Sequence, residues 1–256
     1  MKQTDGAKRA DCVKPRIVFA CSGSAENLAA IPYLASAFDA EIVALTLDVG
    51  QARELEGVRQ AALAAGAVRA HVLDAREEFA RHCLVSSLED QAPTARPLLT
   101  RKLVEIARIE GAAAIAHSGT PEDHAEIEAA ARGLDSKIRV IAAAGAAPLD
   151  AVPAVPSTLW ERSPEDGSRM PRKPELNEPA RLEIAFEGGL PVSVNGVPMT
   201  LTELIESVAT IAEAPAAVVF QAAHEALGAD ASRVSGATVC LELFKGRRRV
   251  VSAPHS

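Results

Sequence analysis

The segment SGSAENL, residues 22–28, has the composition of a loop that binds phosphate groups. It follows an apolar run that ends at Cys21 and precedes an alanine-rich stretch. A loop that binds phosphate needs small residues followed by a helix N-terminus, so that its backbone amides can face the anion. Ser22, Gly23 and Ser24 are small residues of this kind. The segment has neither the Gly-Lys-Ser/Thr of a Walker loop nor the glycine spacing of a dinucleotide fingerprint. We therefore predict a phosphate-gripping loop outside these two motifs.

Four other polar residues have two interpretations each. Cys21 stands before a predicted helix, whose dipole would make a thiol reactive, but we expect a buried packing thiol. His117 is a candidate general base, and we favour a structural or hydrogen-bonding role. His124 near Asp123 and Glu122 suggests a metal pair, whereas a solvated first turn of a helix, whose dipole the two acids complement, is the expectation we adopt. Asp48 has either a phosphate- or magnesium-linked role or a role in a turn, and both stay open.

These residues must be positioned by an α/β fold. Short apolar runs alternate with amphipathic stretches between residues 16 and 144, which is typical of βαβ units around a parallel sheet. The predicted strands are 17–21, 41–47, 70–73, 113–117 and 139–142, and the predicted helices are 26–38, 54–65, 77–88, 97–110 and 122–132. In such a sheet ligands bind outside the carboxyl ends of the strands, where Ser22, Asp48 and His117 would emerge.

We expect four parts along the chain: a disordered tail at 1–15, a nucleotide-binding α/β domain at 16–147, a proline-rich linker or long loop at 148–179, and a smaller α+β domain at 180–256. In the last part, turns at Gly188-Gly189 and Asn195-Gly196 predict an antiparallel meander. Thr200 and Glu203 have the spacing of a capping box. Helices at 200–212 and 216–227 and a closing hairpin at 238–252 complete the prediction.

Composition excludes several classes of protein. The 256 residues are 48% hydrophobic and carry a net charge of −7, with a pI near 5.5, which disfavours nucleic acid as a partner. We interpret the basic cluster at 245–249 as a solvated turn, and the alternative is a contact with a phosphate or with nucleic acid. The four cysteines are too far apart for a C-x-x-C motif and are read as free thiols. Because the sequence shows neither a signal peptide nor an apolar run of about 18 residues, we expect a cytoplasmic protein that does not bind membranes.

Several segments, in the same order along the chain, resemble the argininosuccinate synthase family of PP-loop ATP pyrophosphatases. Residues 22–28 stand where the family has Ser-Gly-Gly-x-Asp-Thr-Ser, and ALTLDVGQ at 44–51 is similar to its Thr-x-Asp-Ile/Val-Gly-Gln turn. Further similar segments are 95–107, 159–163, 177–179, 186–196 and 243–246. The resemblance covers most of residues 16–252, in a chain shorter than the family. It implies a Rossmann-like, doubly wound parallel sheet followed by a smaller α+β domain.

The resemblance implies a reaction in which the ureido oxygen of citrulline attacks the α-phosphate of Mg²⁺-bound ATP, after which aspartate displaces AMP. It implies the cofactors ATP and Mg²⁺, no resident metal site on the protein, and a homo-oligomer. The nucleotide-binding residues implied are Ala20, Ser22, Gly23, Ser24, Asn27, Ala44, Asp48 and Ser118. The implied substrate-binding residues are Thr94, Asp123 and Ser163. No catalytic residue is assigned.

The chain departs from the family in both the nucleotide-binding and the substrate-binding parts of this implied site. In the loop, Ser24, Glu26, Asn27 and Leu28 replace glycine, aspartate, threonine and serine. A tyrosine-containing segment before residue 95 is missing, and the family's His-Gly-x-Thr-Gly-Lys-Gly-Asn-Asp-Gln loop is shortened to residues 117–124. Two hypotheses follow: a ligase whose activity is weakened or altered, or a non-catalytic paralogue that acts as a nucleotide sensor, partner subunit or scaffold.

Overall fold

The computed structural model describes residues 14–51, 54–88, 95–143, 179–228, 235–244 and 247–252. These residues form two compact units. The first contains residues 14–46, 56–72 and 99–143, and the second contains the other described residues, including 73–88. The predicted linker at 148–179 lies outside the described residues, apart from Pro179. Its role as a linker stays a prediction.

A five-stranded sheet carries the first part of the chain. Its strands stand in the order β3-β2-β1-β4-β5, and the pairs β1–β2, β1–β4 and β4–β5 are parallel. The strands are β1 Arg16–Ala20, β2 Glu41–Asp48, β3 Arg69–Asp74, β4 Ala114–His117 and β5 Arg139–Ala142. The helices are α1 Ala25–Phe38, α2 Leu55–Ala64, α3 Arg76–Leu88, α4 Arg96–Glu110 and α5 Pro121–Leu134. Every predicted strand and helix of this part is confirmed.

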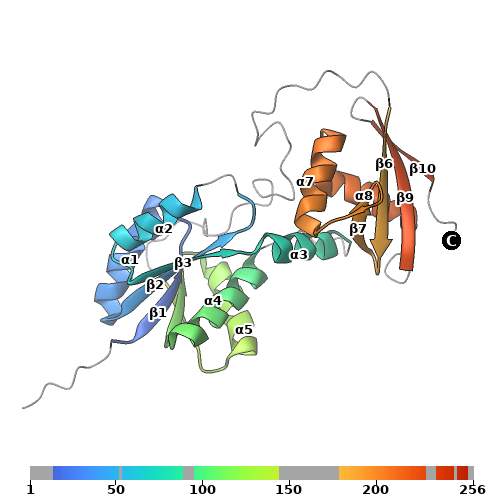
Figure 1. Cartoon of the computed structure of the whole chain (residues 1–256). Helices are drawn as coiled ribbons and strands as arrows, with labels where there is room; N and C mark the ends of the chain where they lie inside the picture. The colour runs from blue at the N-terminus through green and yellow to red at the C-terminus, as the bar shows by residue number, and fades with distance from the viewer. Residues whose placement is uncertain are drawn as a thin grey trace, which may run out of the picture. The chain divides into compact units, whose positions relative to one another are not determined.

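Helices cover both faces of the sheet, with α1 and α2 on one face and α4 and α5 on the other (Figure 1). The central strands β1 and β2 are therefore buried along nearly their whole length, which explains their continuous apolar runs. Phe19 of β1 is fully buried and packs in one cluster with Ile31 and Leu34 of α1. This packing holds α1 against β1.

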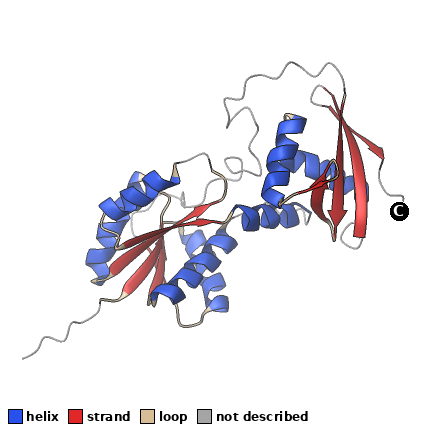
Figure 2. Cartoon of the chain, in the orientation of Figure 1, coloured by secondary structure: helices blue, strands red, loops and turns tan. Residues whose placement is uncertain are grey.

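An antiparallel sheet and two helices form the C-terminal part. The sheet order is β10-β9-β6-β7-β8, and α7 and α8 lie on one of its faces (Figure 2). The elements are β6 Ala180–Glu187, β7 Leu190–Val194, β8 Val197–Pro198, α7 Leu201–Ala212, α8 Ala216–Leu227, β9 Ser235–Phe244 and β10 Arg247–Ser252. Asn195 and Gly196 have φ values of 50° and 76° between paired strands β7 and β8. This two-residue loop confirms the turn predicted from their residue types.

The start of α7 is capped twice. Thr200 and Glu203 form the predicted capping box. In addition, the Glu77 carboxylate of α3 accepts hydrogen bonds from the Leu201 and Thr202 amides, at 3.3 and 3.0 Å. A carboxylate at a helix N-terminus is stabilised by the free amides and by the helix dipole. Helix α3, which follows β3 in the chain, is therefore part of the second unit.

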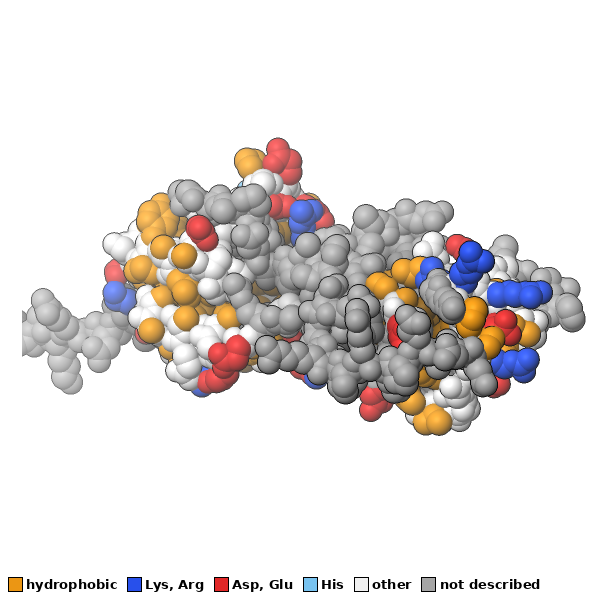
Figure 3. Space-filling model, turned by 90° about the horizontal axis from the view of Figure 1, so that it is seen from above, with side chains coloured by type: hydrophobic (Ala, Val, Ile, Leu, Met, Phe, Trp, Pro, Cys, Tyr) orange, Lys and Arg blue, Asp and Glu red, His pale blue; other side chains and the backbone are white. Residues whose placement is uncertain are grey.

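Three arginines of the predicted basic turn instead lie on a strand. Arg247, Arg248 and Arg249 belong to β10, the edge strand of the antiparallel sheet, and all are exposed. Figure 3 shows Lys and Arg side chains gathered on this C-terminal part, at the right of the view. Lys245 lies outside the described residues. The prediction that the cluster is solvated is confirmed for the three arginines. Arg249 lies in a strand of the predicted closing hairpin, whereas the assignment of Arg247 and Arg248 to a turn is wrong.

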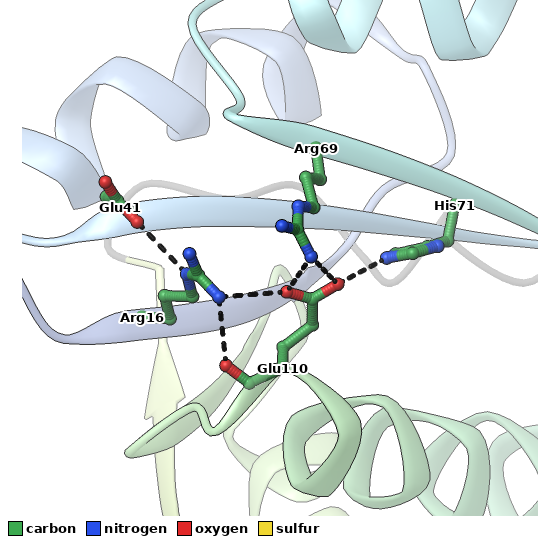
Figure 4. A network of polar contacts seen from close by, with 5 residues as sticks. All are labelled: Arg16, Glu41, Arg69, His71 and Glu110. Carbon is green, nitrogen blue, oxygen red and sulfur yellow. Dashed lines mark hydrogen bonds and ion pairs between the residues drawn. The ribbon is translucent and has the colours of Figure 1, made fainter.

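A nearly buried carboxylate joins three elements at the amino edge of the parallel sheet (Figure 4). Glu110, at the end of α4, has a side chain that is 2% exposed. It accepts hydrogen bonds from Arg16 of β1 at 3.2 Å and from Arg69 of β3 at 2.8 Å, and contacts His71 at 2.9 Å. Arg16 also pairs with Glu41 of β2. Burial by itself would raise the Glu110 pKa, but the hydrogen bonds from His71 and Arg69 outweigh it and lower that pKa.

Candidate functional site

The predicted phosphate loop joins β1 to α1. Ser24 is the N-cap of α1, and its side-chain oxygen accepts a hydrogen bond from the Asn27 amide. Gly23 has a φ of 77°, a conformation that residues with a side chain rarely adopt. A Cβ added at Gly23 would lie 2.8 Å from Cγ1 of Val58 in α2. Both backbone conformation and packing therefore require glycine at this position.

The Asn27 side chain forms hydrogen bonds within its own loop. Its side-chain Oδ1 accepts hydrogen bonds from the Ser22 amide at 2.8 Å and from the Ser22 hydroxyl at 3.1 Å. The Ser22 oxygen in turn accepts a bond from the Ser24 amide at 3.2 Å. Asn27 is only 2% exposed. The structure thus brings together three of the predicted nucleotide-binding residues, in a network of bonds to one another.

Strand β4 ends beside β1, so the residues that follow both strands emerge at the same edge of the sheet. Ser118 comes directly after β4 and is buried. Within the described part of the chain, its hydroxyl has no hydrogen-bond partner, and neither has Nδ1 of His117. Buried polar atoms are normally hydrogen-bonded, and exceptions often mark functional positions.

His117 and His124 form a hydrogen-bonded pair. His117 Nε2 lies 3.0 Å from His124 Nδ1, the ring centroids are 5.2 Å apart and the ring planes differ by 27°. The 3.0 Å separation is that of a hydrogen bond between the two ring nitrogens. The hydrogen-bonding role favoured for His117 is confirmed. His124 is half-buried rather than solvated.

Asp123 caps the helix that follows this pair. Its carboxylate accepts a hydrogen bond from the Thr120 amide at 3.0 Å, while the Thr120 side chain accepts one from the Asp123 amide at 3.2 Å. This is a complete capping box at the start of α5, and Asp123 is 4% exposed. The capping interaction therefore occupies a residue that the sequence predicts to bind substrate.

Asp48 lies at the end of β2 in a turn closed by side chains. Its Oδ1 accepts a hydrogen bond from the Gly50 amide at 2.9 Å, and Gln51 bonds to the backbone of Leu47 and Val49. Its Oδ2 is 3.7 Å from Nε of Arg76. Arg76 is also bonded to Asp74, which lowers the Asp74 pKa. The turn role of Asp48 is thus present, and Arg76 is a neighbour that its sequence position did not reveal.

The remaining predicted residues divide into two groups. Ala20 ends β1, and Ala44 lies in β2, where it pairs with Phe19; both are buried. Cys21 is also buried, as expected. Thr94 and Ser163 lie outside the described residues, and their substrate contacts stay predictions.

The pH dependence of stability should reveal the buried state of His117. Burial, reinforced by the charge of His124 and opposed by that of Asp123, lowers the His117 pKa from 6.5 to about 4. The unfolded chain therefore binds this proton more readily than the folded chain. Neutral His117 therefore stabilises the folded chain above pH 6.5, and this contribution should be lost as the pH falls towards 4. Between pH 7 and pH 5 we expect the free energy of unfolding to fall by about 2 kcal/mol from this group.

Urea unfolding at several pH values measures this effect. The variant His117→Gln should lose that part of the pH dependence while the contributions of other groups remain. An unchanged slope in the variant would show that His117 is not buried in its neutral form.

The parallel sheet, its helical layers and the small-residue loop after the first strand together define an α/β protein of the nucleotide-binding HUP class. The model of the "Arginosuccinate synthase N-terminal HUP domain" matches residues 16–150. The chain belongs to the argininosuccinate synthase family, as the sequence resemblance indicated. Among the described residues, no helix is both long and apolar enough to cross a membrane.

Curated relatives extend the similarity into the C-terminal part. The chain is 30% identical to the argininosuccinate synthase of Streptococcus suis in an alignment of length 246 that covers 78% of this chain and 62% of the relative. It is 33% identical to that of Anoxybacillus flavithermus, with coverage of 75% and 59%. Over 139 residues it is 41% identical to that of Oleidesulfovibrio alaskensis, covering 50% of this chain and 35% of the relative. The chain thus spans about three fifths of the length of the first two relatives.

Proposed function

We propose that the chain binds an adenine nucleotide at the carboxyl edge of β1 and β4, and that ligation of citrulline to aspartate is weakened or lost. The observation that carries the proposal is the loop between β1 and α1, in which Gly23 is required by the backbone and Ser24 caps the helix. In this proposal the nucleotide contacts Ala20, Ser22, Gly23, Ser24, Asn27, Ala44, Asp48 and Ser118. The amino-acid substrates of the family would meet Thr94, Asp123 and Ser163.

Two contacts support a loss of turnover. Leu28, which replaces a family serine, packs against the apolar core and offers no hydrogen bond to a phosphate. The Asp123 carboxylate is engaged in the capping box of α5, so an amino-acid substrate would compete with the helix for it. A non-catalytic protein that senses a nucleotide, serves as a partner subunit or acts as a scaffold would tolerate both features.

The Mg²⁺ that the family reaction implies has few protein ligands. Among the described residues, no group of three or more His, Cys, Asp or Glu side chains is placed to hold a metal ion. The Asp48 carboxylate is engaged by the Gly50 amide and lies near Arg76. Nucleotide-bound Mg²⁺ is held largely by phosphates and water, with one or two carboxylates. Glu26, exposed in the first turn of α1, is the acidic residue within the loop that we propose for this contact.

Calorimetric titration with Mg-ATP, followed by an assay of pyrophosphate release with citrulline and aspartate, tests the proposal. We expect ATP to bind and pyrophosphate release to remain at the background rate. A full-length argininosuccinate synthase assayed in parallel serves as the positive control. Absence of ATP binding would refute the nucleotide-binding role, and turnover comparable to the control would refute the loss of ligation.

A further inference from the structure

We infer that Asn27 sets the affinity of the loop for phosphate by occupying the donors that a phosphate oxygen would use. This inference rests on the nucleotide binding proposed above. The Asn27 carboxamide oxygen accepts two hydrogen bonds, one from the Ser22 amide and one from the Ser22 hydroxyl. An amide and a hydroxyl at the start of a helix are a donor pair suited to a phosphate oxygen. Asn27 thus takes the place of an anionic ligand in its own loop.

The other contacts of the loop leave little freedom to release these donors. The Asn27 amide is held by the Ser24 side-chain oxygen, and the Ser24 amide is held by Ser22. Val58 packs so close to Gly23 that an added Cβ would lie 2.8 Å from its Cγ1. A phosphate that needs the Ser22 donors must therefore displace the buried Asn27 side chain while the backbone stays in place.

No positive charge within the loop offsets the free energy that displacing the Asn27 side chain would cost. Glu26 is the only charged residue within 22–28, and it is acidic and exposed. The segment therefore offers no cationic side chain to an added phosphate. We expect the unmodified chain to bind adenosine and ATP with similar affinity, because its phosphates add little to the binding free energy.

Two substitutions of Asn27 change this discrimination in opposite directions. Asn27→Ala removes the internal acceptor and should raise the affinity for Mg-ATP about tenfold, the factor that one hydrogen bond of ordinary net strength represents. Asn27→Asp keeps the shape and places a charged oxygen on the same donors, so ATP affinity should fall about tenfold. Affinity for adenosine should be unchanged in both variants, because adenosine carries no phosphate.

Calorimetric titrations of the whole chain with Mg-ATP and with adenosine measure these ratios. Ser36→Ala, an exposed position on the same helix, is the control and should leave both affinities unchanged. If Asn27→Ala fails to fold, as judged by circular dichroism, the nearly isosteric Asn27→Asp carries the test alone.

The outcomes separate this inference from the proposed function. If ATP binds and Asn27→Ala weakens it or leaves it unchanged, Asn27 merely shapes the loop and the inference is wrong, while nucleotide binding stands. If Asn27→Asp binds ATP as well as the unmodified chain does, the inference is also wrong. If neither the unmodified chain nor any variant binds ATP or adenosine, both proposals fail.

Discussion

Replacing Gly23 by alanine is expected to destabilise the protein by about 3 kcal/mol and to abolish nucleotide binding. An alanine in the left-handed region costs about 1–2 kcal/mol. Its Cβ would also lie 2.8 Å from a methyl carbon of Val58, and such overpacking typically costs about 1–3 kcal/mol. Relief of either strain moves the amides of the loop, so binding should be lost with stability. Urea unfolding and ATP titration measure the two effects.

A second substitution separates the two sources of strain. Val58→Ala removes the methyl groups that the new Cβ meets, so the double variant should recover about 1–2 kcal/mol relative to the sum of the single changes. The penalty from the positive φ should remain. A Gly23→Ala variant that is as stable as the unmodified chain and still binds ATP would contradict the geometry of the loop.

Replacing Glu110 by alanine is expected to destabilise the chain by about 3 kcal/mol. Its carboxylate is nearly buried and meets Arg16, Arg69 and His71. Removing one partner of a buried ion pair costs about 3–5 kcal/mol. The lower end applies here because Arg69 and, to a smaller extent, Arg16 can turn towards water. Urea unfolding at neutral pH measures the loss.

The matched control is Glu105→Ala on the same helix. The Glu105 side chain is 53% exposed, so water can replace much of its contact with Lys102 at 3.3 Å, and we expect its removal to cost about 1 kcal/mol. Glu110→Gln, which keeps one acceptor oxygen, should lie between the control and Glu110→Ala. Equal stabilities of Glu105→Ala and Glu110→Ala would show that the network at the amino edge of the sheet contributes no more than a surface pair.

Local patterns predicted the elements of this protein accurately. The Asn195-Gly196 turn and the Thr200–Glu203 capping box were evident because each depends on residues only a few positions apart. The apolar runs of β1 and β2 were evident because both faces of these strands are covered. The family resemblance identified the loop at 22–28 and the strand ends beside it.

Contacts within the candidate site were only partly predictable. Replacement of the family threonine by Asn27 was visible in the sequence, but its carboxamide could have pointed to solvent, to a ligand or back to Ser22. Thr120 and Asp123 have the spacing of a capping box. The family resemblance instead implied that Asp123 binds substrate, so its capping role was not predicted. The approach of Arg76 to Asp48 depends on how the ends of β2 and β3 are placed, which no local pattern encodes.

The sequence by itself determined the order and type of the elements, the α/β class, the family and the position of the loop between β1 and α1. Only the tertiary structure decided that the loop is closed on Asn27, that Asp123 caps α5 and that Glu110 meets Arg16 and Arg69. Secondary structure and turns depend on neighbours along the chain, whereas these side-chain partners depend on strand order and on which donors are left free after folding. The predicted phosphate loop is thus located from its sequence, but its proposed readiness to accept a phosphate depends on the contacts that the fold creates.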